Sequence, residues 1–438
     1  MIVYVTFKSK IEVDNKKLRS YLNCCGGCTR FVKNWAIQLQ GERRANGQWL
    51  LPYNQLSDKL TELKHEAGYE FLNNVPAASL QQALRDISNT FERYILPEVD
   101  KGKQGWPDFR SKHRGDSFKV PQLRSDWWFD EANSRVWLPK YGYVHYFNSR
   151  PMELKLPDGT SIKGKTKNYV FKREGVDWFV FACVEFNAPK PEADVCFNFD
   201  DIVGIDVGVV HAVTLSDGRH FDLDLDKIRK IEDDIAYLNR KRSLNILRRK
   251  QMAEKGQAKP YDPNKPSRTD RELLRRIRKK YILIKDTRDD FYRKVASAVA
   301  QEYKCVAMER LNLPGMVKSA KGTVDEPGKG VKRKTRLNRS LARVAMGTLQ
   351  RKIQCAVERH GGDLIYVNAA YTSIDCPECG YRKSKNRVTR DTFRCMACNY
   401  QNDADVVGGI NIKKRALEVL EAKGVLGAGS PECALKKH

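Results

Sequence analysis

The 438-residue sequence contains 80 Lys and Arg against 54 Asp and Glu, which gives a formal net charge of +26. This charge favours a polyanionic partner such as a nucleic acid. No apolar run is long enough to span a bilayer, and the opening stretch MIVYVTFKSKIEV is too short and too charged for a signal peptide. We therefore expect a soluble, intracellular protein of two to four domains rather than a membrane or secreted protein.

The first 200 residues predict a β-rich module interrupted by helices. The opening stretch alternates like a strand, and residues 15–100 carry helical patterns. One predicted helix has Ser79 as its N-cap and an apolar stripe formed by Leu80, Leu84, Ile87, Phe91 and Ile95. Residues 101–200 then turn to Gly, Pro, basic and aromatic residues and to short alternating runs such as SRVWLPKYGYVHYF. We expect a small β-barrel with a helical insertion.

The second half begins with the run NFDDIVGIDVGVVHAVTLSDG, which predicts a β-hairpin. Two long helices should follow as an antiparallel pair. Their apolar stripes are Ile228, Ile231, Ile235 and Leu238, and then Ile284, Phe291, Val295 and Val299. The Pro-rich segment EKGQAKPYDPNKPSRTD between them should be an exposed connection, and the tail after residue 424 should be disordered.

Two CxxC pairs separated by fifteen residues predict one tetrahedral structural zinc site, with the ligands Cys376, Cys379, Cys395 and Cys398. Such a site has no open coordination position, so it cannot catalyse. A second cluster, formed by Cys24, Cys25 and Cys28, could hold a metal, but it lacks a spaced partner pair and is followed at once by a helical pattern, so we expect no metal there. The remaining cysteines in apolar stretches should pack as small buried side chains: Cys183, Cys196, Cys305 and Cys355.

Three acids stand at the ends of predicted elements. Asp206 follows a strand in VGIDVG, Glu309 ends another in CVAMERL, and Asp405 opens a helix. Acids at such places are commonly solvated caps. Together, however, they supply the carboxylates that two divalent metals need to hydrolyse a phosphodiester. Asp403 is an alternative to Asp405, and Gly208 would let a phosphate backbone approach closely.

A strand Asp, a later strand Glu and a helix Asp occur in the order typical of RuvC-type nucleases. The CxxC…CxxC insert between the second and third acids resembles the TnpB family, the insertion-sequence-encoded, RNA-guided nucleases ancestral to type V CRISPR effectors. The resemblance covers nearly the whole chain. CTRFVKNWAI is similar to the N-terminal helix, SLQQALRDISNTFERY to the recognition-lobe helix, KGKQGWPDFRSK and LPKYGYVHYFNSR to the wedge domain, and GIDVGVVHAVTLSDG and AMERLNL to the first two RuvC motifs.

The resemblance implies a multidomain α+β fold in four parts. These are a wedge β-barrel (1–14 and 101–200), a helical recognition insertion (15–100), an RNase H-like (RuvC) α/β nuclease domain (201–373 and 401–423) and a zinc ribbon insert (374–400). It further implies that a guide RNA is bound, that an adjacent motif is recognised, and that guide-matched double-stranded DNA is cut. Asp206, Glu309 and Asp405 would be the catalytic residues and would bind two Mg²⁺. The location would be the cytoplasm of a prokaryote, in association with the nucleoid.

One motif departs from the family. Its third motif usually reads Asp-x-Asn-Ala-Ala, whereas Asp405 is followed by Val406, Val407, Gly408 and Gly409. Two glycines lower helix propensity, so we expect slower or less stable cleavage.

Contacts to nucleic acid fall on the recognition and wedge segments. Arg110, Lys112 and Lys119 lie in basic stretches that include Gly and aromatic residues, so they are candidates for phosphate contacts, although charged residues often only face solvent. The resemblance adds four residues near the adjacent motif: Tyr53, Gln81, Gln82 and Ser117.

Three other functions stay open. They are a guided but nuclease-inactive repressor, a conventional RNase H-like transposase, and a zinc-ribbon nucleic-acid-binding protein without catalysis. Loss of one acid would mark the repressor, whereas copurifying RNA would separate the guided nuclease from the transposase.

Overall fold

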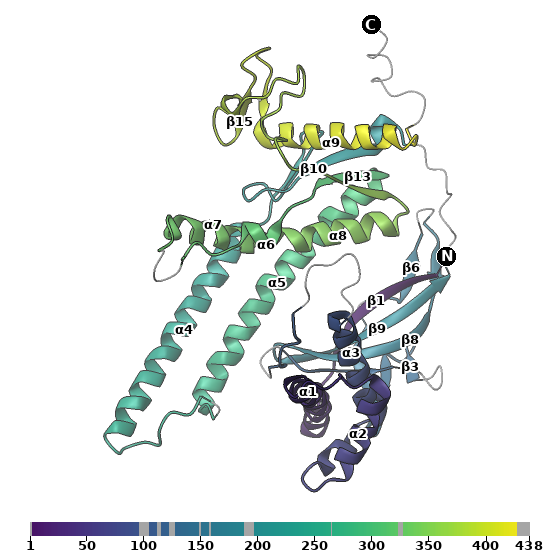
Figure 1. Ribbon diagram of the computed structural model, residues 1–438, viewed down its shortest axis with the longest axis vertical. Helices are drawn as coiled ribbons and strands as arrows, with labels where there is room; N and C mark the ends of the chain where they lie inside the picture. The colour runs from purple at the N-terminus through teal and green to yellow at the C-terminus, as the bar shows by residue number, and fades with distance from the viewer. Residues whose placement is uncertain are drawn as a thin grey trace. The chain divides into compact units, whose positions relative to one another are not determined.

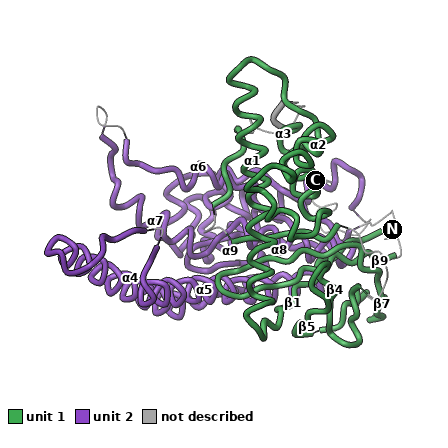
Figure 2. Tube along the Cα trace, turned by 90° about the horizontal axis from the view of Figure 1, so that it is seen from below, with its two compact units in different colours: residues 1–189 green, residues 190–438 purple. Residues whose placement is uncertain are grey.

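The computed structural model describes residues 2–95, 105–111, 115–121, 128–148, 150–156, 159–187, 197–263, 265–322 and 327–426. The chain divides into two compact units, residues 1–189 and 190–438 (Figure 2). Within the described residues, no helix is long and apolar enough to cross a membrane. Most of the tail that we expected to be disordered, residues 427–438, lies outside the described residues.

The first unit is built on a seven-stranded antiparallel sheet. Its strands, in spatial order, are β2 (Ser117–Val120), β8 (Lys165–Glu174), β9 (Asp177–Asn187), β1 (Ile2–Ile11), β5 (Gly142–Phe147), β4 (Arg135–Leu138) and β3 (Phe129–Asp130). Strand β1 pairs with β9 from Ile2↔Asn187 to Lys10↔Phe179, which brings the two ends of the unit together. In the described part of the chain, β2 and β3 are the edges of an open sheet. A separate hairpin joins β6 (Glu153–Lys155) to β7 (Ser161–Lys163).

Helices fill the predicted insertion between β1 and β2. They are α1 (Lys16–Ala45), α2 (Tyr53–His65), the short 3₁₀ helix η1 (Glu70–Asn74) and α3 (Ala77–Ile95). Helix α1 begins where the Asn15 side chain accepts a hydrogen bond from the Leu18 N–H at 2.7 Å. The predicted stripe of α3 is buried at Leu80, Leu84, Ile87 and Phe91, whereas the Ile95 side chain lies outside the described residues.

The prediction of Ser79 as the N-cap of α3 is wrong. The helix begins two residues earlier, at Ala77, so Ser79 lies inside its first turn. The Ser79 side chain is buried and donates a hydrogen bond to the Lys119 carbonyl oxygen at 2.8 Å. Its hydroxyl therefore attaches α3 to strand β2 instead of capping the helix.

The second unit contains a mixed five-stranded sheet. Its order is β12 (His220–Phe221), β11 (Val213–Leu215), β10 (Ile202–Asp206), β13 (Cys305–Glu309) and β14 (Asp363–Val367). The last three strands are parallel, whereas β10 and β11 form the predicted antiparallel hairpin. The short central strands are apolar and buried, as expected of parallel strands covered on both faces.

Two sets of helices cover this sheet (Figure 1). Val203 and Ile205 of β10 point to the face covered by α5 (Arg268–Glu302) and α8 (Met346–Arg359). Ile202 points to the other face, which is covered by α9 (Ala404–Ala422). The contact of α9 with β10 is so close that a Cβ atom on Gly204 would overlap the carbonyl oxygen of Gly409.

The long helices α4 (Leu225–Glu254) and α5 form the predicted antiparallel hairpin (Figure 1). The predicted stripe of α4 is buried throughout, and that of α5 is buried except at Phe291, which is half-buried. Strand β13 is followed by α6 (Leu313–Met316) and α7 (Val331–Val344).

Candidate functional site

Two of the three predicted acids end neighbouring parallel strands. Asp206 is the last residue of β10 and Glu309 is the last residue of β13. The pairing of Ile205 with Met308 puts the residues that follow them, Asp206 and Glu309, side by side. The carboxyl ends of parallel strands meet at one edge of a sheet, which is where ligands bind in open α/β sheets. The fold therefore brings the first two acids together.

The third acid arrives from α9. Asp405 is the second residue of that helix, whose N-cap is Asp403. The Asp403 carboxylate accepts hydrogen bonds from the backbone N–H groups of Asp405 at 2.8 Å and Val406 at 3.1 Å. Asp403 thus serves the helix start, which leaves the Asp405 side chain to face the sheet edge.

Two glycines show how closely the backbone of these elements approaches the carboxylates. A Cβ atom on Gly408 of α9 would lie 3.2 Å from Asp206 Oδ2, and one on Gly208 would lie 3.8 Å from Asp405 Oδ2. Within the described chain, only the four ribbon cysteines bring three or more potential metal-ligand atoms within 4.8 Å of one another. The three carboxylates thus share one edge without closing on a common point.

Burial disfavours the charged forms of two of these acids, and repulsion by the other carboxylates adds to this effect at Asp206. Burial raises the pKa of Asp206 to about 7, and the nearby charges of Glu309 and Asp405 add to the effect. Burial also raises the pKa of Glu309, against the hydrogen bond that the Thr372 hydroxyl donates to it. A bound cation would relieve both penalties, and perturbed carboxylates of this kind are typical of functional sites.

Arg387, which the sequence analysis missed, contacts the third acid. Its guanidinium group lies 3.2 Å from Asp405 Oδ1, and both side chains are half-buried. The same group donates to the Arg390 carbonyl oxygen at 2.6 Å, which fixes its direction. Arg387 comes from the loop between the two CxxC pairs. No spacing rule singles it out among the basic residues of that loop.

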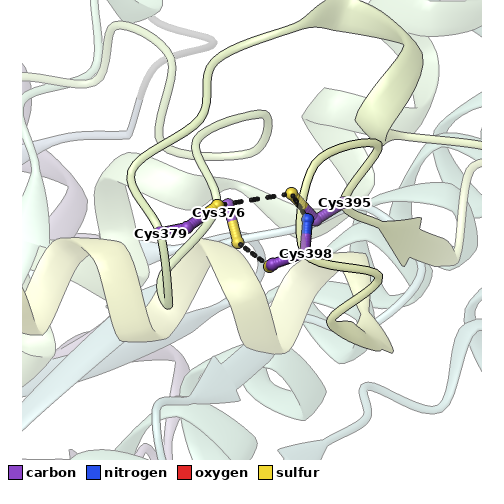
Figure 3. Close-up of side chains that lie close together, drawn as sticks. All are labelled: Cys376, Cys379, Cys395 and Cys398. Carbon is purple, nitrogen blue, oxygen red and sulfur yellow. Dashed lines mark hydrogen bonds between the residues drawn. The ribbon is translucent and has the colours of Figure 1, made fainter.

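The four predicted zinc ligands meet in one cluster (Figure 3). The Sγ atoms of Cys376 and Cys398 are 3.6 Å apart, and so are those of Cys379 and Cys395. Burial acts against ionisation of Cys395, but the backbone N–H groups of Ala397 and Cys398 outweigh it and lower the pKa of this thiol to about 6. A thiolate at neutral pH is the form that binds metal.

The segment that carries the four cysteines, residues 374–400, which we call the ribbon, leads into α9. Its hairpin joins β15 (Thr392–Arg394) to β16 (Gln401–Asp403), and α9 follows β16 directly. A small buried core combines Phe393, Cys376 and Cys395 of the ribbon with Ala404 and Val407 of the helix. Because Ala404 precedes Asp405 and Val407 follows it, these contacts fix the helix backbone on both sides of Asp405.

Further along α9, two side chains bind the segment that leads into the first CxxC pair. The Asn411 amide donates to the carbonyl oxygens of Thr372 at 2.7 Å and Asp375 at 2.9 Å. The Arg415 guanidinium group pairs with Asp375 at 3.2 Å. Because Thr372 is also bonded to Glu309, one hydrogen-bonded chain links the second acid, the ribbon entry and α9.

Among the described residues, the other cysteines do not belong to a cluster that could bind a metal ion. Cys24 and Cys28 are 3.9 Å apart through their Sγ atoms, one turn apart on α1, and burial raises the pKa of Cys28 to about 12. The expectation of burial holds for Cys305 but is wrong for Cys355, which is exposed on α8. Cys183 is half-buried, and Cys196 lies outside the described residues.

The candidate nucleic-acid contacts all belong to the first unit. Ser117 and Lys119 share the half-buried face of β2, next to the start of α3, which carries Gln81 and Gln82. Gln82 is engaged with Asp86 at 2.9 Å. Three further residues complete the set: Tyr53 at the start of α2, with Arg85 over its ring, Arg110, which is exposed, and Lys112, which lies outside the described residues.

Two family models match the second unit. Residues 198–320 match the OrfB_IS605 family, described as "Probable transposase". Residues 347–412 match the family described as "Cas12f1-like, TNB domain". The first match contains Asp206 and Glu309, and the second contains the four ribbon cysteines and Asp405.

Whole-chain relatives agree with these matches. The chain is 29% identical over 405 residues to an Escherichia coli (strain K12) protein named "Putative RNA-guided DNA endonuclease InsQ", covering 92% of this chain and 90% of that protein. It is 24% identical over 400 residues to the "Putative RNA-guided DNA endonuclease" of Streptomyces pristinaespiralis, covering 88% and 83%. These matches confirm the resemblance to the TnpB family.

Among solved structures, the mini-RNA-guided endonuclease CRISPR-Cas_phi3 matches with 12% identity and a TM-score of 0.42, covering 95% of this chain and 92% of that one.

Proposed function

We propose that the chain is an RNA-guided DNA endonuclease of the TnpB type. It would bind a guide RNA from the transposon end, recognise a transposon-adjacent motif and cut guide-matched double-stranded DNA. The observation that carries the proposal is the placement of Asp206, Glu309 and Asp405 along one sheet edge, next to a cluster of four cysteines. Similarity to InsQ over most of the chain supports it, and the net charge of +26 suits a long RNA and a heteroduplex.

We assign the second unit to the RNase H-like (RuvC) fold and the first to the wedge and recognition parts of the family. The parallel strands with helices on both faces and the sheet with its helical insertion support this assignment. The domains would be the wedge (1–14 and 101–200), the recognition insertion (15–100), the nuclease domain (201–373 and 401–423) and the ribbon (374–400). Such a protein would work where the DNA is, in the cytoplasm and nucleoid of a prokaryote.

The donor set at the sheet edge fits Mg²⁺, which prefers carboxylate oxygens. Two bound Mg²⁺ ions would activate water and stabilise the leaving oxygen of the phosphodiester. The fold fixes the positions of the three carboxylates. Asp206 and Glu309 end adjacent strands, and the backbone of Asp405 is held by the helix cap at Asp403. The guanidinium group of Arg387 lies where it would meet the negative charge of a phosphate bound to these carboxylates.

The ribbon cysteines would hold one structural Zn²⁺. Four converging sulfur atoms, one of them with a lowered pKa, fit this ion. Because the ribbon core includes Ala404 and Val407, folding of the ribbon would place Asp405.

The unusual third motif has a packing role that supports this arrangement. Val407 is fully buried in the ribbon core, where the family usually has Asn. Gly408 and Gly409 leave room for Asp206 and for the backbone of Ser216, which a Cβ atom on Gly409 would approach to 3.0 Å. The glycines thus favour close approach of α9 at a cost in helix propensity.

The proposal is tested by reprogramming. RNA that copurifies with the protein is sequenced, its guide portion is replaced, and cutting of DNA is mapped. Cuts should move with the new guide. Cuts that stay at the original site would disprove guidance and favour a conventional transposase, the alternative that the description of the matched family favours.

A further inference from the structure

Positive charge is concentrated at the far end of the α4–α5 hairpin. Residues 240–280, which we name the distal arm, contain sixteen Lys and Arg against four Asp and Glu. Their net charge of +12 is nearly half of the +26 that the whole chain carries. The arm comprises the second half of α4, the connecting segment and the first part of α5.

The acids of the arm do little to offset this charge. Asp270 is buried and pairs with Arg242 at 2.5 Å, where it holds the two helices together. Arg248, Lys250 and Arg276 are exposed, and no acidic side chain of the described residues pairs with them. Like charges packed this densely repel one another, so a bound polyanion would stabilise the arm.

Exposed apolar side chains alternate with these cations. Leu244, Leu247 and Met252 of the arm are each about half exposed, at 55%, 52% and 46%, and so is Tyr281, which directly follows the arm on α5, at 57%. Phosphate groups are bound by the cations alone, so the exposed apolar side chains indicate a ligand that also offers apolar surface. Unpaired RNA bases stack on aromatic side chains and pack on apolar ones, whereas a DNA duplex keeps its bases stacked inside. Pairing of two arms from two copies of the chain would bring equal positive charges together, which disfavours it.

The arm also lies far from the carboxylates. A helix rises about 1.5 Å per residue, so the first turn of α5 is roughly 50 Å from its last. Only the C-terminal part of α5, around Tyr292 and Val295, packs on the sheet that carries Asp206 and Glu309. Figure 1 shows the other ends of α4 and α5 pointing away from β10 and β13. The ligand of the arm is therefore remote from the scissile phosphate.

We propose that the distal arm is a docking surface for the structured part of the guide RNA, with its cations on phosphates and its exposed apolar side chains on unpaired bases. The inference rests on the proposed function, because it names where the RNA of that function is held. It does not depend on cutting.

The test compares two triple variants of equal charge change. The arm variant carries Arg248→Gln, Lys250→Gln and Arg276→Gln. The control variant carries Arg229→Gln, Arg293→Gln and Lys294→Gln, three cations on the same helices that already pair with acids within their own helix. The probe is the RNA that copurifies with the wild-type protein, and its affinity is measured over a series of salt concentrations.

We expect the arm variant to bind this RNA about tenfold more weakly, with a salt slope lower by about 2, because about 0.7 to 0.9 counterions are released per phosphate contact. The control should stay within about twofold of the wild type, because its cations already pair with acids of their own helices. Equal losses in both variants, an unchanged arm variant, or the absence of copurifying RNA would overturn the proposal.

Two further outcomes separate this proposal from the proposed function. An arm variant that keeps its RNA affinity but loses affinity for duplex DNA would show that the arm holds DNA, and the inference would be wrong. A wild-type complex that binds RNA through the arm but does not cut guide-matched DNA would leave the inference standing and disprove the nuclease.

Discussion

The guanidinium group of Arg387 and the carboxylate of Asp405 form an ion pair at 3.2 Å, joining the ribbon loop to the first turn of α9. The two residues are eighteen positions apart, and the second CxxC pair lies between them. The pair therefore exists only when the ribbon is folded onto the helix. This relationship makes the ribbon part of the carboxylate site and gives the first prediction.

Arg387→Ala should slow cutting of guide-matched DNA by about 100-fold, the typical loss when one stabilising donor is removed from a reacting centre. Guide and target binding should be unchanged, and the comparison is a time course of cutting at saturating target. Arg394→Ala, in the same ribbon but exposed and bonded only weakly to Asn399, is the matched control. Equal cutting by wild type and Arg387→Ala would show that the ion pair has no part in the reaction.

Removal of one ribbon thiol should abolish zinc binding. Elemental analysis should find one zinc per wild-type chain and none in Cys376→Ser, because three ligands do not close a tetrahedral site. Cutting should fall as well, since the ribbon core encloses Asp405. Cys355→Ser, at an exposed position on α8, should keep both zinc and activity. Full zinc occupancy in Cys376→Ser would rule out the four-cysteine site.

The close contact between α9 and β10 predicts a stability loss at Gly204. Gly204→Ala would push its Cβ atom against the Gly409 carbonyl oxygen. Overpacking of this kind lowers the free energy of unfolding by about 1–3 kcal/mol. The loss should appear as a lower midpoint of thermal unfolding of the second unit. Gly27→Ala is the control, because the nearest atom to its Cβ would be 4.0 Å away in helix α1. An unchanged midpoint for Gly204→Ala would contradict the packing.

The raised pKa of Asp206 predicts how stability depends on pH without added magnesium. Burial raises this pKa from 3.8 to about 7, so the folded protein holds the proton more tightly than the unfolded chain. The stability from this group is complete below pH 4 and is lost as the pH rises through 7. Asp206→Asn should therefore flatten the pH dependence of the unfolding midpoint between pH 4 and 8. A variant with the wild-type slope would show that Asp206 ionises normally.

Local patterns in the sequence predicted much of the fold and the site. The apolar stripes of α4 and α5, the hairpin of β10 and β11 and the convergence of four cysteines follow from period and spacing, which are properties of neighbouring residues. The ends of adjacent parallel strands also bring Asp206 next to Glu309 once the strands are identified.

Contacts that depend on tertiary packing could not be predicted in this way. Arg387 meets Asp405 only through the fold of the ribbon, and the Asn411 amide reaches Thr372 across 39 residues. Cys355 lies between the buried Ile353 and Val357 but points to solvent, because a shift of two positions on a helix turns a side chain away from the buried face. Ser79 caps nothing because its hydroxyl reaches strand β2 instead.

The most direct measurement of the central claim is cutting of guide-matched DNA in Mg²⁺ by Asp206→Ala, Glu309→Ala and Asp405→Ala, each loaded with guide RNA. We expect all three to lose cutting, because a site that lacks one carboxylate cannot hold both ions at the scissile phosphate, while guide and target binding persist. Asp403→Ala should be milder, because Asp403 caps α9 and a cap contributes about 1 kcal/mol. If Asp403→Ala were inactive and Asp405→Ala active, the third assignment would be wrong; if all four variants still cut, the nuclease site itself would be disproved.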